Sequence, residues 1–397
     1  MEPIVVQKYG GSSVADAGRI QRVAARVAAT RATGKRVVVV VSAMGDTTDE
    51  LLALARTVSP DPHRRELDML LTAGERISMA LLGMALHARS VEAVSFTGSQ
   101  SGIITDGAHT NARILEVRPV RILEELSRGR VVIVAGYQGV SREREVTTLG
   151  RGGSDTTAVA LAAALSAEVC EICSDVDGVY TADPRIVPGA RRLASLSHEE
   201  MQELARAGAR VLNAQAVEFA RDKGITIHAL STFAPGAGTR VSAQAGQGAR
   251  ERELRVSGVA LDADILVVHG SGGAEELAQL AELFARNGAW PREWWADGTD
   301  SRAILSLENV HGLATLVGEL QALGPRVAVE EGLAQVSVVG VGMGAGAEPL
   351  SRLLRALPEA PRAVDVAPLR LSALVPRALA ADCVRKLHAE FVEKSAP

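Results

Sequence analysis

The chain has 397 residues, of which 47% are hydrophobic and 23% are charged, which is the balance of a globular protein long enough for two or three domains. A formal net charge of -4, with no basic stripe along the chain, excludes a typical nucleic-acid-binding surface. The N-terminus lacks the basic start and apolar segment of a signal peptide, and no apolar run approaches a membrane span, so we expect a cytoplasmic protein.

Short apolar strands alternate with longer helical stretches over residues 4–241. This alternation is typical of an α/β domain with a mainly parallel central sheet covered by helices. The helix expected at 156–167 is apolar almost all round, which predicts that it is buried. The clearest predicted strands are residues 4–8, 37–42, 131–135 and 169–174, and the predicted helices are residues 15–32, 67–88, 113–128 and 156–167.

The pattern changes after residues 244–255, which contain Gly and Gln and then charged residues and predict a linker. Beyond the linker, strands and helices recur in two short units of the same order, which predicts two small α+β domains of βαββαβ type. The expected domains are therefore residues 1–245, 256–331 and 332–397.

The first motif is a predicted strand that runs into two glycines and then a helix. It reads Lys8, Tyr9, Gly10, Gly11 and Ser12. Glycines at a helix start let backbone amides approach an anion, and a lysine adds a mobile positive charge. This pattern predicts phosphate binding, although an ordinary strand-to-helix turn would look similar.

A second glycine-rich stretch, residues 147–157, also precedes a helix. Arg151 can hold a carboxylate through two hydrogen bonds, and Ser154 with the helix-start amides of Gly152 and Gly153 adds donors. Asp155 can organise Mg²⁺ through water, or it can cap the helix.

A third motif, residues 174–185, leaves the strand at 169–174 as an irregular polar stretch. In open α/β folds the nucleotide binds beyond the carboxyl ends of sheet strands. The alternative is a long turn rich in Asp and Gly.

Cys170 and Cys173 lie on the strand at 169–174 and alternate as buried residues do. We therefore expect core thiols in preference to a redox or zinc site.

Together with residues 42–49 and 72–78, these motifs resemble those of the aspartate kinase family, which has the amino acid kinase fold. The resemblance covers residues 4–240 with the motifs in family order, and no P-loop sequence is present. It implies transfer of the γ-phosphoryl group of ATP, bound as MgATP, to the side-chain carboxylate of L-aspartate, at the start of lysine, threonine and methionine synthesis. Because that carboxylate is already ionised at pH 7, the reaction needs positioning and charge neutralisation and no general base.

The resemblance also implies roles for individual residues. Catalysis would rest on Lys8, Glu75 and Asp155, with Glu75 facing the ammonium group of aspartate and Arg151 its α-carboxylate. No metal-binding set of side chains is predicted, since Mg²⁺ enters with ATP. The nucleotide would contact Lys8, Tyr9, Gly10, Gly11, Ser12, Ser42, Ser174, Asp175, Tyr180, Thr181, Ala182, Asp183, Pro184, Arg185 and Arg210. Aspartate would contact Thr47, Thr48, Glu75, Arg151, Gly152, Gly153 and Ser154.

The two C-terminal units are similar to ACT domains, which bind end-product amino acids in this family and pair across subunits, so the resemblance implies an amino-acid effector and a homo-oligomer. Where relatives carry effector loops, this chain has a Gly-rich stretch at 269–274 and three tryptophans, Trp290, Trp294 and Trp295. We therefore expect inhibition by lysine or threonine to be weakened, lost or redirected to another ligand. The alternative for the tryptophans is packing where small domains meet.

Two other functions remain open at this point. The first is a related kinase that phosphorylates glutamate, acetylglutamate or a nucleotide monophosphate. The second is a catalytically inactive amino-acid sensor that has kept the fold. Residues 42–49 and 74–78 argue against the first alternative, and the presence of Lys8, Glu75, Arg151 and Asp155 argues against the second.

Overall fold

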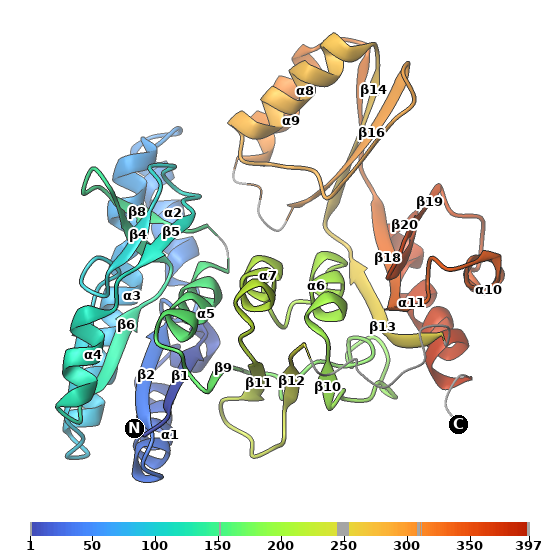
Figure 1. Ribbon diagram of the computed structural model, residues 1–397. Helices are drawn as coiled ribbons and strands as arrows, with labels where there is room; N and C mark the ends of the chain where they lie inside the picture. The colour runs from blue at the N-terminus through green and yellow to red at the C-terminus, as the bar shows by residue number, and fades with distance from the viewer. Residues whose placement is uncertain (1, 151, 244–253, 308–309, 311, 395–397) are drawn as a thin grey trace. The chain divides into compact units, whose positions relative to one another are not determined.

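A computed structural model describes residues 2–150, 152–243, 254–307, 310 and 312–394 (Figure 1). The chain forms two compact units. The first comprises the residues up to Val179 together with 192–202 and 210–243, and the second comprises 180–191, 203–209 and the described residues from 254 onward. Most of the predicted linker, residues 244–253, lies outside the described residues.

The first unit is built on an eight-stranded sheet that is parallel except where β11 pairs with β12. This confirms the predicted α/β class with a mainly parallel central sheet. β1 lies between β9 and β2 and pairs with both in parallel, so the strand order reverses beside it. The strands are, in spatial order, β10 (Ser195–Leu196), β12 (Thr239–Val241), β11 (Ile227–Ser231), β9 (Val169–Ser174), β1 (Ile4–Tyr9), β2 (Arg36–Val41), β6 (Val131–Ala135) and β3 (Ala93–Phe96).

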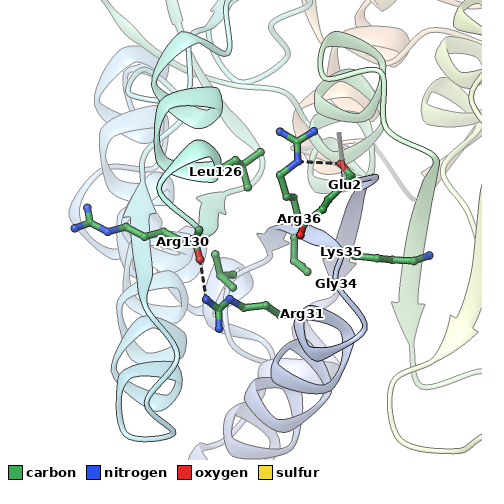
Figure 2. A pocket seen from close by; sticks show the side chains of 10 residues that line it. Glu2, Arg31, Gly34, Lys35, Arg36, Leu126 and Arg130 are labelled. Atoms are coloured by element: carbon green, nitrogen blue, oxygen red, sulfur yellow. Dashed lines mark hydrogen bonds between the residues drawn. The ribbon is translucent and has the colours of Figure 1, made fainter.

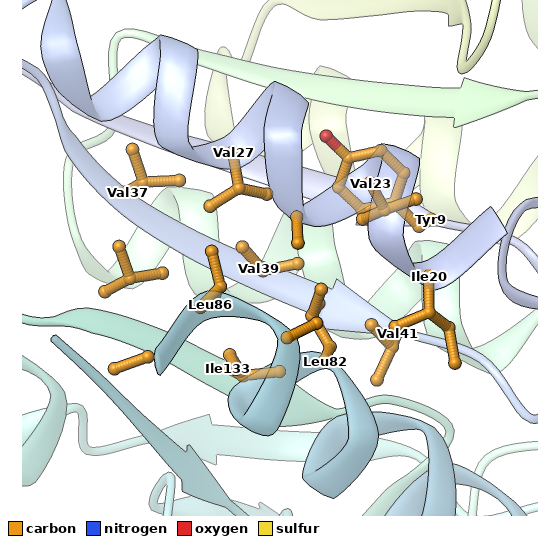
Figure 3. Packing of buried hydrophobic residues seen from close by; sticks show 14 of the residues in the cluster. Tyr9, Ile20, Val23, Val27, Val37, Val39, Val41, Leu82, Leu86 and Ile133 are labelled. Carbon is orange, nitrogen blue, oxygen red and sulfur yellow. The ribbon is translucent and has the colours of Figure 1, made fainter. Parts of the chain in front are cut away.

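Helices cover both faces of this sheet. Odd-numbered residues of β2 point toward α1 and α3, and Figure 3 shows Val37, Val39 and Val41 packed against Leu82 and Leu86. Even-numbered residues point to the opposite face, where α5 contacts β1, β2 and β9. The unit contains η1 (Gly11–Val14), α1 (Ala17–Ala32), α2 (Thr47–Val58), α3 (Arg64–His87), α4 (Val120–Ser127), α5 (Gly153–Ala164), the first half of α6 (His198–Arg206) and α7 (Ala214–Lys223).

The prediction of a helix at residues 113–128 is wrong for the first half of that range. Residues Ile114–Val117 form strand β5, and only α4, Val120–Ser127, is helical. β5 pairs with β4, so a tertiary partner overrides a helical pattern that the sequence shows by itself. The small sheet that results has the order β5, β4 (Ile103–Thr105), β7 (Gln138–Ser141) and β8 (Val146–Thr148).

Helix α3 is, among the described helices, the one that is long and apolar enough to cross a membrane by length and composition. This differs from the expectation that no such run exists. Half of its apolar window is buried, and the helix packs against α1, α2, β3, β6 and β8. It also buries two carboxylates, Asp68 and Glu75, so α3 is a core helix of the first unit.

The second unit contains two antiparallel four-stranded sheets, as expected for two small α+β domains. Helices α8 and α9 cover one sheet, and α10 and α11 cover the other. The uncovered faces pack on each other through Ile265, Val267, Ile304, Leu333 and Leu374. The first sheet has the order β15 (Glu293–Ala296), β16 (Asp300–Ser306), β14 (Ile265–Ser271) and β17 (Val327–Glu330), with α8 (Ala274–Arg286) and α9 (Leu313–Ala322).

The second sheet includes β13 (Arg255–Asp262), a strand that precedes both repeats in the sequence. The order of this sheet is β13, β18 (Leu333–Val341), β20 (Arg370–Pro376) and β19 (Ala363–Ala367), with α10 (Ala347–Ala356), η3 (Arg377–Leu379), α11 (Ala380–His388) and the π-helical turn η4 (Ala389–Glu393). In the first sheet, β17 is the edge strand that pairs with β14. In the second sheet, β13 is the edge strand that pairs with β18, the strand equivalent to β14. The strand β13 thus belongs to the second sheet, although most of it falls within the predicted domain 256–331.

Candidate active site

The glycine turn after β1 lies where the strand order of the main sheet reverses, the position at which open α/β sheets bind ligands. The backbone N–H of Gly10 donates to the carbonyl of Cys173 on β9 (3.3 Å). A Cβ on Gly11 would lie 2.9 Å from the carbonyl oxygen of Gly45 and 3.0 Å from that of Ala43. Only glycine therefore lets the turn approach the loop after β2 so closely.

Lys8 and Asp155 form an ion pair at this turn. Nζ of Lys8 lies 2.6 Å from Oδ1 of Asp155, and their side chains are 13% and 10% exposed. The structure thus brings together the first and second motifs, which lie far apart in the sequence. Tyr9 behaves differently, because its side chain lies in the core (Figure 3) and its hydroxyl donates to Gln7 (3.2 Å). Only the backbone of Tyr9 borders the turn, where its carbonyl accepts from Ser42 N–H (3.0 Å).

The loop that follows β2 is held by helix α3. The hydroxyl of Ser78 donates to the carbonyl of Ser42 (2.7 Å), and the N–H of Ala43 donates to Oε1 of Glu75 (3.0 Å). A Cβ on Gly74 would lie 2.7 Å from the Cβ of Ala43, so the absence of a side chain there lets α3 press on the loop. Thr47 and Thr48, the predicted substrate contacts, begin α2 at the end of this loop.

Glu75 is buried with an incomplete set of partners. It is 3% exposed, and its Oε2 has no hydrogen-bond partner among the described residues. Burial raises the pKa of the Glu75 carboxyl to about 7, against the lowering effect of hydrogen bonds from its own backbone and from Ala43. A buried carboxylate with a vacant oxygen is costly unless a cation reaches it.

The second glycine loop forms the start of α5. Gly152 caps the helix with φ of +73°, and the Asn213 side chain fills the space that a Cβ on Gly152 would need. Asn213 also caps α7 and donates its backbone N–H to Oδ2 of Asp155 (3.4 Å). Gly153 and Ser154 are buried in the first turn of α5, whereas Arg151 lies outside the described residues.

Ser174 joins the glycine turn, whereas Asp175 is exposed just beyond it. The carbonyl of Ser174 accepts from the backbone N–H of Thr232 (2.7 Å), and the Thr232 hydroxyl lies 2.6 Å from that of Ser13. The carboxyl ends of β1, β9 and β11 therefore meet at one place. Arg210 is exposed in the turn before α7. The buried free thiols of Cys170 and Cys173 lie on β9, and burial raises the pKa of both, which confirms the expectation of core thiols.

The remaining predicted nucleotide contacts, Tyr180 to Arg185, belong to the second compact unit. Thr181 and Ala182 are buried there, with Ala182 in the core of the second sheet. Asp183 and Arg185 are more exposed and pair with each other at 2.7 Å, and the Arg185 hydrogen bonds hold the pKa of the Asp183 carboxyl below its usual value.

Sequence reasoning missed Asp68, a fully buried acid on α3. Its Oδ1 accepts hydrogen bonds from the Thr148 hydroxyl (2.5 Å) and the Thr110 N–H (3.0 Å), and its Oδ2 lies 2.6 Å from Nδ1 of His109. Burial raises the pKa of the Asp68 carboxyl, and these hydrogen bonds act against that rise. An acidic residue on the inner face of an apolar helix was the available signal.

A pocket of about 270 Å³ lies at the opposite edge of the sheet (Figure 2). Arg36 and Val37 at the start of β2 and Val131 at the start of β6 line it, with Arg31, Lys35 and Arg130 around the rim. Because the glycine turns follow the carboxyl ends of the strands, this pocket is separate from the site described above.

In the second unit, Trp294 and Trp295 lie in strand β15, which pairs with β16, and Trp290 precedes the strand. Trp294 stacks edge-on against Phe284 at 5.5 Å and lies 6.0 Å from Trp290. Arg292 pairs with the buried Asp262 at 2.6 Å. Packing therefore accounts for Trp294, whereas Trp290 and Trp295 are 67% and 52% exposed.

A model of the amino acid kinase family matches residues 3–231, which is more than half of the chain, and the sheet with its glycine turns accordingly defines the protein as an amino acid kinase. Aspartokinase from Thermus thermophilus is 41% identical over 405 residues and covers 98% of both chains. The chain therefore belongs to the aspartokinase family.

Other relatives agree. Aspartokinase from Mycolicibacterium smegmatis is 62% identical over 239 residues, which are 60% of this chain and 57% of that protein. The match thus spans little more than half the length of that relative. Among solved structures, E. coli aspartokinase III in complex with aspartate and ADP (R-state) superposes with a TM-score of 0.83 at 27% identity and covers 98% of this chain and 99% of that one. The same enzyme with lysine and aspartate (T-state) gives 0.77.

Proposed function

We propose that the protein transfers the γ-phosphoryl group of ATP to the side-chain carboxylate of L-aspartate and forms 4-phospho-L-aspartate. The observation that carries this proposal is Glu75, whose buried carboxyl has one oxygen without a hydrogen-bond partner in the described part of the chain. In the proposed complex, the ammonium group of aspartate occupies that place. An N-acetylated amino acid or a nucleotide monophosphate carries no such ammonium, so Glu75 favours a free amino acid as acceptor.

Lys8 and the glycine turns supply the remaining chemistry. Two anions must approach in line, and positive charge between them lowers their repulsion. Lys8 lies between the turn after β1 and Asp155, where its ammonium group can follow the transferring phosphoryl group. The N–H groups of Gly10 to Ser12 and those at the start of α5 would hold phosphate oxygens. Arg151 keeps its proposed role at the α-carboxylate of aspartate.

Magnesium is proposed to arrive with ATP. The described residues contain no group of three His, Cys, Asp or Glu side chains that could hold a metal ion. Mg²⁺ is commonly held by one or two carboxylates together with water and substrate phosphates, and Asp155, 7% exposed beside Lys8, fits that requirement. When bound, the ion neutralises phosphate charge.

We propose the same nucleotide contacts and domain organisation that the sequence predicts. ATP would contact Ser42, Ser174, Asp175, Arg210 and the segment from Tyr180 to Arg185. We also propose a cytoplasmic homo-oligomer with domains 1–245, 256–331 and 332–397, in which β13 completes the sheet of the last domain.

The regulatory half is proposed to respond weakly to lysine and threonine, or to bind another amino acid. The support is that part of residues 290–295, where an effector loop is expected, forms strand β15, which pairs with β16, and that Arg292 pairs with Asp262. Tight inhibition by either amino acid would contradict this part of the proposal and leave the kinase assignment intact.

The deciding experiment is ATP- and Mg²⁺-dependent acyl-phosphate formation, trapped as hydroxamate, with aspartate, glutamate or acetylglutamate as acceptor and with lysine and threonine added singly and together. We expect turnover with aspartate alone. Lys8→Met should lower kcat by at least about 1,000-fold, since charge stabilisation of transferring phosphate is worth that much. Lys35→Met is the matched control, because Lys35 pairs with Glu168 near the opposite edge of the sheet. Absence of turnover with every acceptor would favour the inactive sensor.

A further inference from the structure

Thr181 is a buried polar anchor of the segment that carries the proposed nucleotide contacts, and it lies in the second unit. Its N–H donates to the carbonyl of Arg191 (2.9 Å), and its carbonyl accepts from Val259 on β13 (2.7 Å). Its hydroxyl accepts from the N–H of Arg191 (3.0 Å). Thr181 is 5% exposed, so its side chain points into the protein and fixes the position of its segment there.

The fourth contact of Thr181 is a buried histidine from the far end of the chain. Nε2 of His388, at the end of α11, lies 2.9 Å from the Thr181 hydroxyl oxygen. Nδ1 of the same ring lies 3.1 Å from a carboxylate oxygen of Glu393. The π-helical turn η4, Ala389–Glu393, returns the chain so that Glu393 reaches the ring.

Both ring nitrogens of His388 have a partner. The Thr181 hydroxyl, which accepts a hydrogen bond from Arg191, has both a hydrogen to donate and a further lone pair, so it can pair with Nε2 in either tautomer of the ring. Nδ1 pairs with Glu393 on the other side of the ring. Every polar atom of the buried ring is then satisfied, as the fully buried position of His388 requires.

We propose that His388 is a positioning residue for the nucleotide, acting through Thr181 on the segment that carries Asp183 and Arg185. The inference rests on the proposed function, in which that segment borders ATP. His388 is fully buried and so is not proposed to touch a substrate. Because His388 lies at the end of α11, the inference makes nucleotide affinity depend on the position of this helix end and of η4.

The experiment compares paired variants that remove or keep each hydrogen bond. Thr181→Val keeps the shape and removes the hydroxyl, whereas Thr181→Ser keeps the hydroxyl. His388→Leu removes both ring contacts, whereas His388→Gln retains an amide that can accept from Thr181. His269→Gln is the control, because His269 pairs with Glu330 at 2.9 Å and is 43% exposed. Initial rates with varied ATP and varied aspartate are combined with direct titration of a fluorescent ADP analogue.

Thr181→Val and His388→Leu each remove two hydrogen bonds, and we expect each to raise the KM for ATP and the Kd for the ADP analogue at least about five- to tenfold. The aspartate KM and kcat should stay within about twofold in His388→Leu. Thr181→Ser and His388→Gln should restore nucleotide affinity, and His269→Gln should resemble the wild type. If His388→Leu fails to fold, the Thr181 pair decides alone.

Two results would overturn the inference: an unchanged nucleotide affinity in Thr181→Val, or parallel changes in both KM values and kcat, which indicate a general structural defect. A wild-type protein without turnover would instead contradict the proposed function, and the ADP titration would then decide the role of His388 by itself.

Discussion

Helix α3 buries two carboxylates about two turns apart, and the fold treats them in opposite ways. Asp68 receives hydrogen bonds from Thr148 and Thr110 and contacts the His109 ring. Glu75 receives one from Ala43, and its second oxygen has no partner among the described residues. Burial raises the pKa of both carboxyls. A satisfied buried acid belongs to the scaffold, whereas an incompletely satisfied one is kept for a ligand.

Replacing Glu75 should have the largest effect on activity. Glu75→Gln removes the charge proposed to face the aspartate ammonium, which is worth about 3 to 4 kcal/mol in a buried pair, so kcat/KM for aspartate should fall about 100- to 1,000-fold. The same variant should be more stable than the ligand-free wild type at pH 8. Hydroxamate assays and thermal unfolding measure the two effects. Unchanged aspartate kinetics would show that Glu75 does not bind the substrate.

The pH dependence follows from the direction of the Glu75 shift. A folded-state pKa of about 7 exceeds the ordinary value of 4.5, so the folded protein binds more protons than the unfolded chain between these values. The free energy of unfolding therefore falls as pH rises through this window, by about 3 kcal/mol in total. Aspartate needs the ionised form, so its KM should fall about tenfold from pH 6 to pH 8. Glu75→Gln should lose both trends.

Removing Asp68 should reverse the sign of the stability effect. Asp68→Ala leaves the Thr148 hydroxyl, the Thr110 N–H and the His109 ring without their partner inside the protein. We expect a loss of about 2 to 4 kcal/mol and a lower melting temperature, with a smaller change in aspartate KM than in Glu75→Gln. A variant as stable as the wild type would show that Asp68 is not part of the scaffold.

The smallest effect concerns the contact that places Glu75. Gly74→Ala puts a methyl group 2.7 Å from the Cβ of Ala43, so α3 must shift away from the loop after β2 at a cost of about 1 to 3 kcal/mol. The aspartate KM should rise about three- to tenfold. Gly318→Ala in α9 is the control, since nothing lies within 4 Å of its added Cβ, and it should be neutral or slightly stabilising. Equal kinetics in both variants would refute the steric argument.

Strong local patterns could be predicted from the sequence, and pairing between distant segments could not. The strand at 169–174 was predicted with the bounds that β9 has, because an apolar alternation between a buried helix and a polar turn has one interpretation. Residues 114–117 were assigned to a helix, since nothing local reveals that β4 pairs with them. Strand β15 was missed because the tryptophan stretch shows no alternating pattern of its own, and its pairing with β16 is a contact between separate segments.

In the site, too, local motifs could be predicted and contacts between distant residues could not. Lys8, Gly11 and Gly152 were predicted from the glycine-rich motifs that contain them. The ion pair between Lys8 and Asp155 and the vacant oxygen of Glu75 required coordinates. Thr181 was predicted as a nucleotide contact, but its hydrogen bond to a histidine 207 residues away has no local signal.

The membership of residues 180–191 in the second unit also bears on how such a protein can evolve. A gene truncated at the linker would lose β13, which supplies the Val259 N–H that donates to the carbonyl of Thr181, and with it one support of residues 180–191. A deletion of the C-terminal half would therefore disturb a segment that precedes the linker in the sequence.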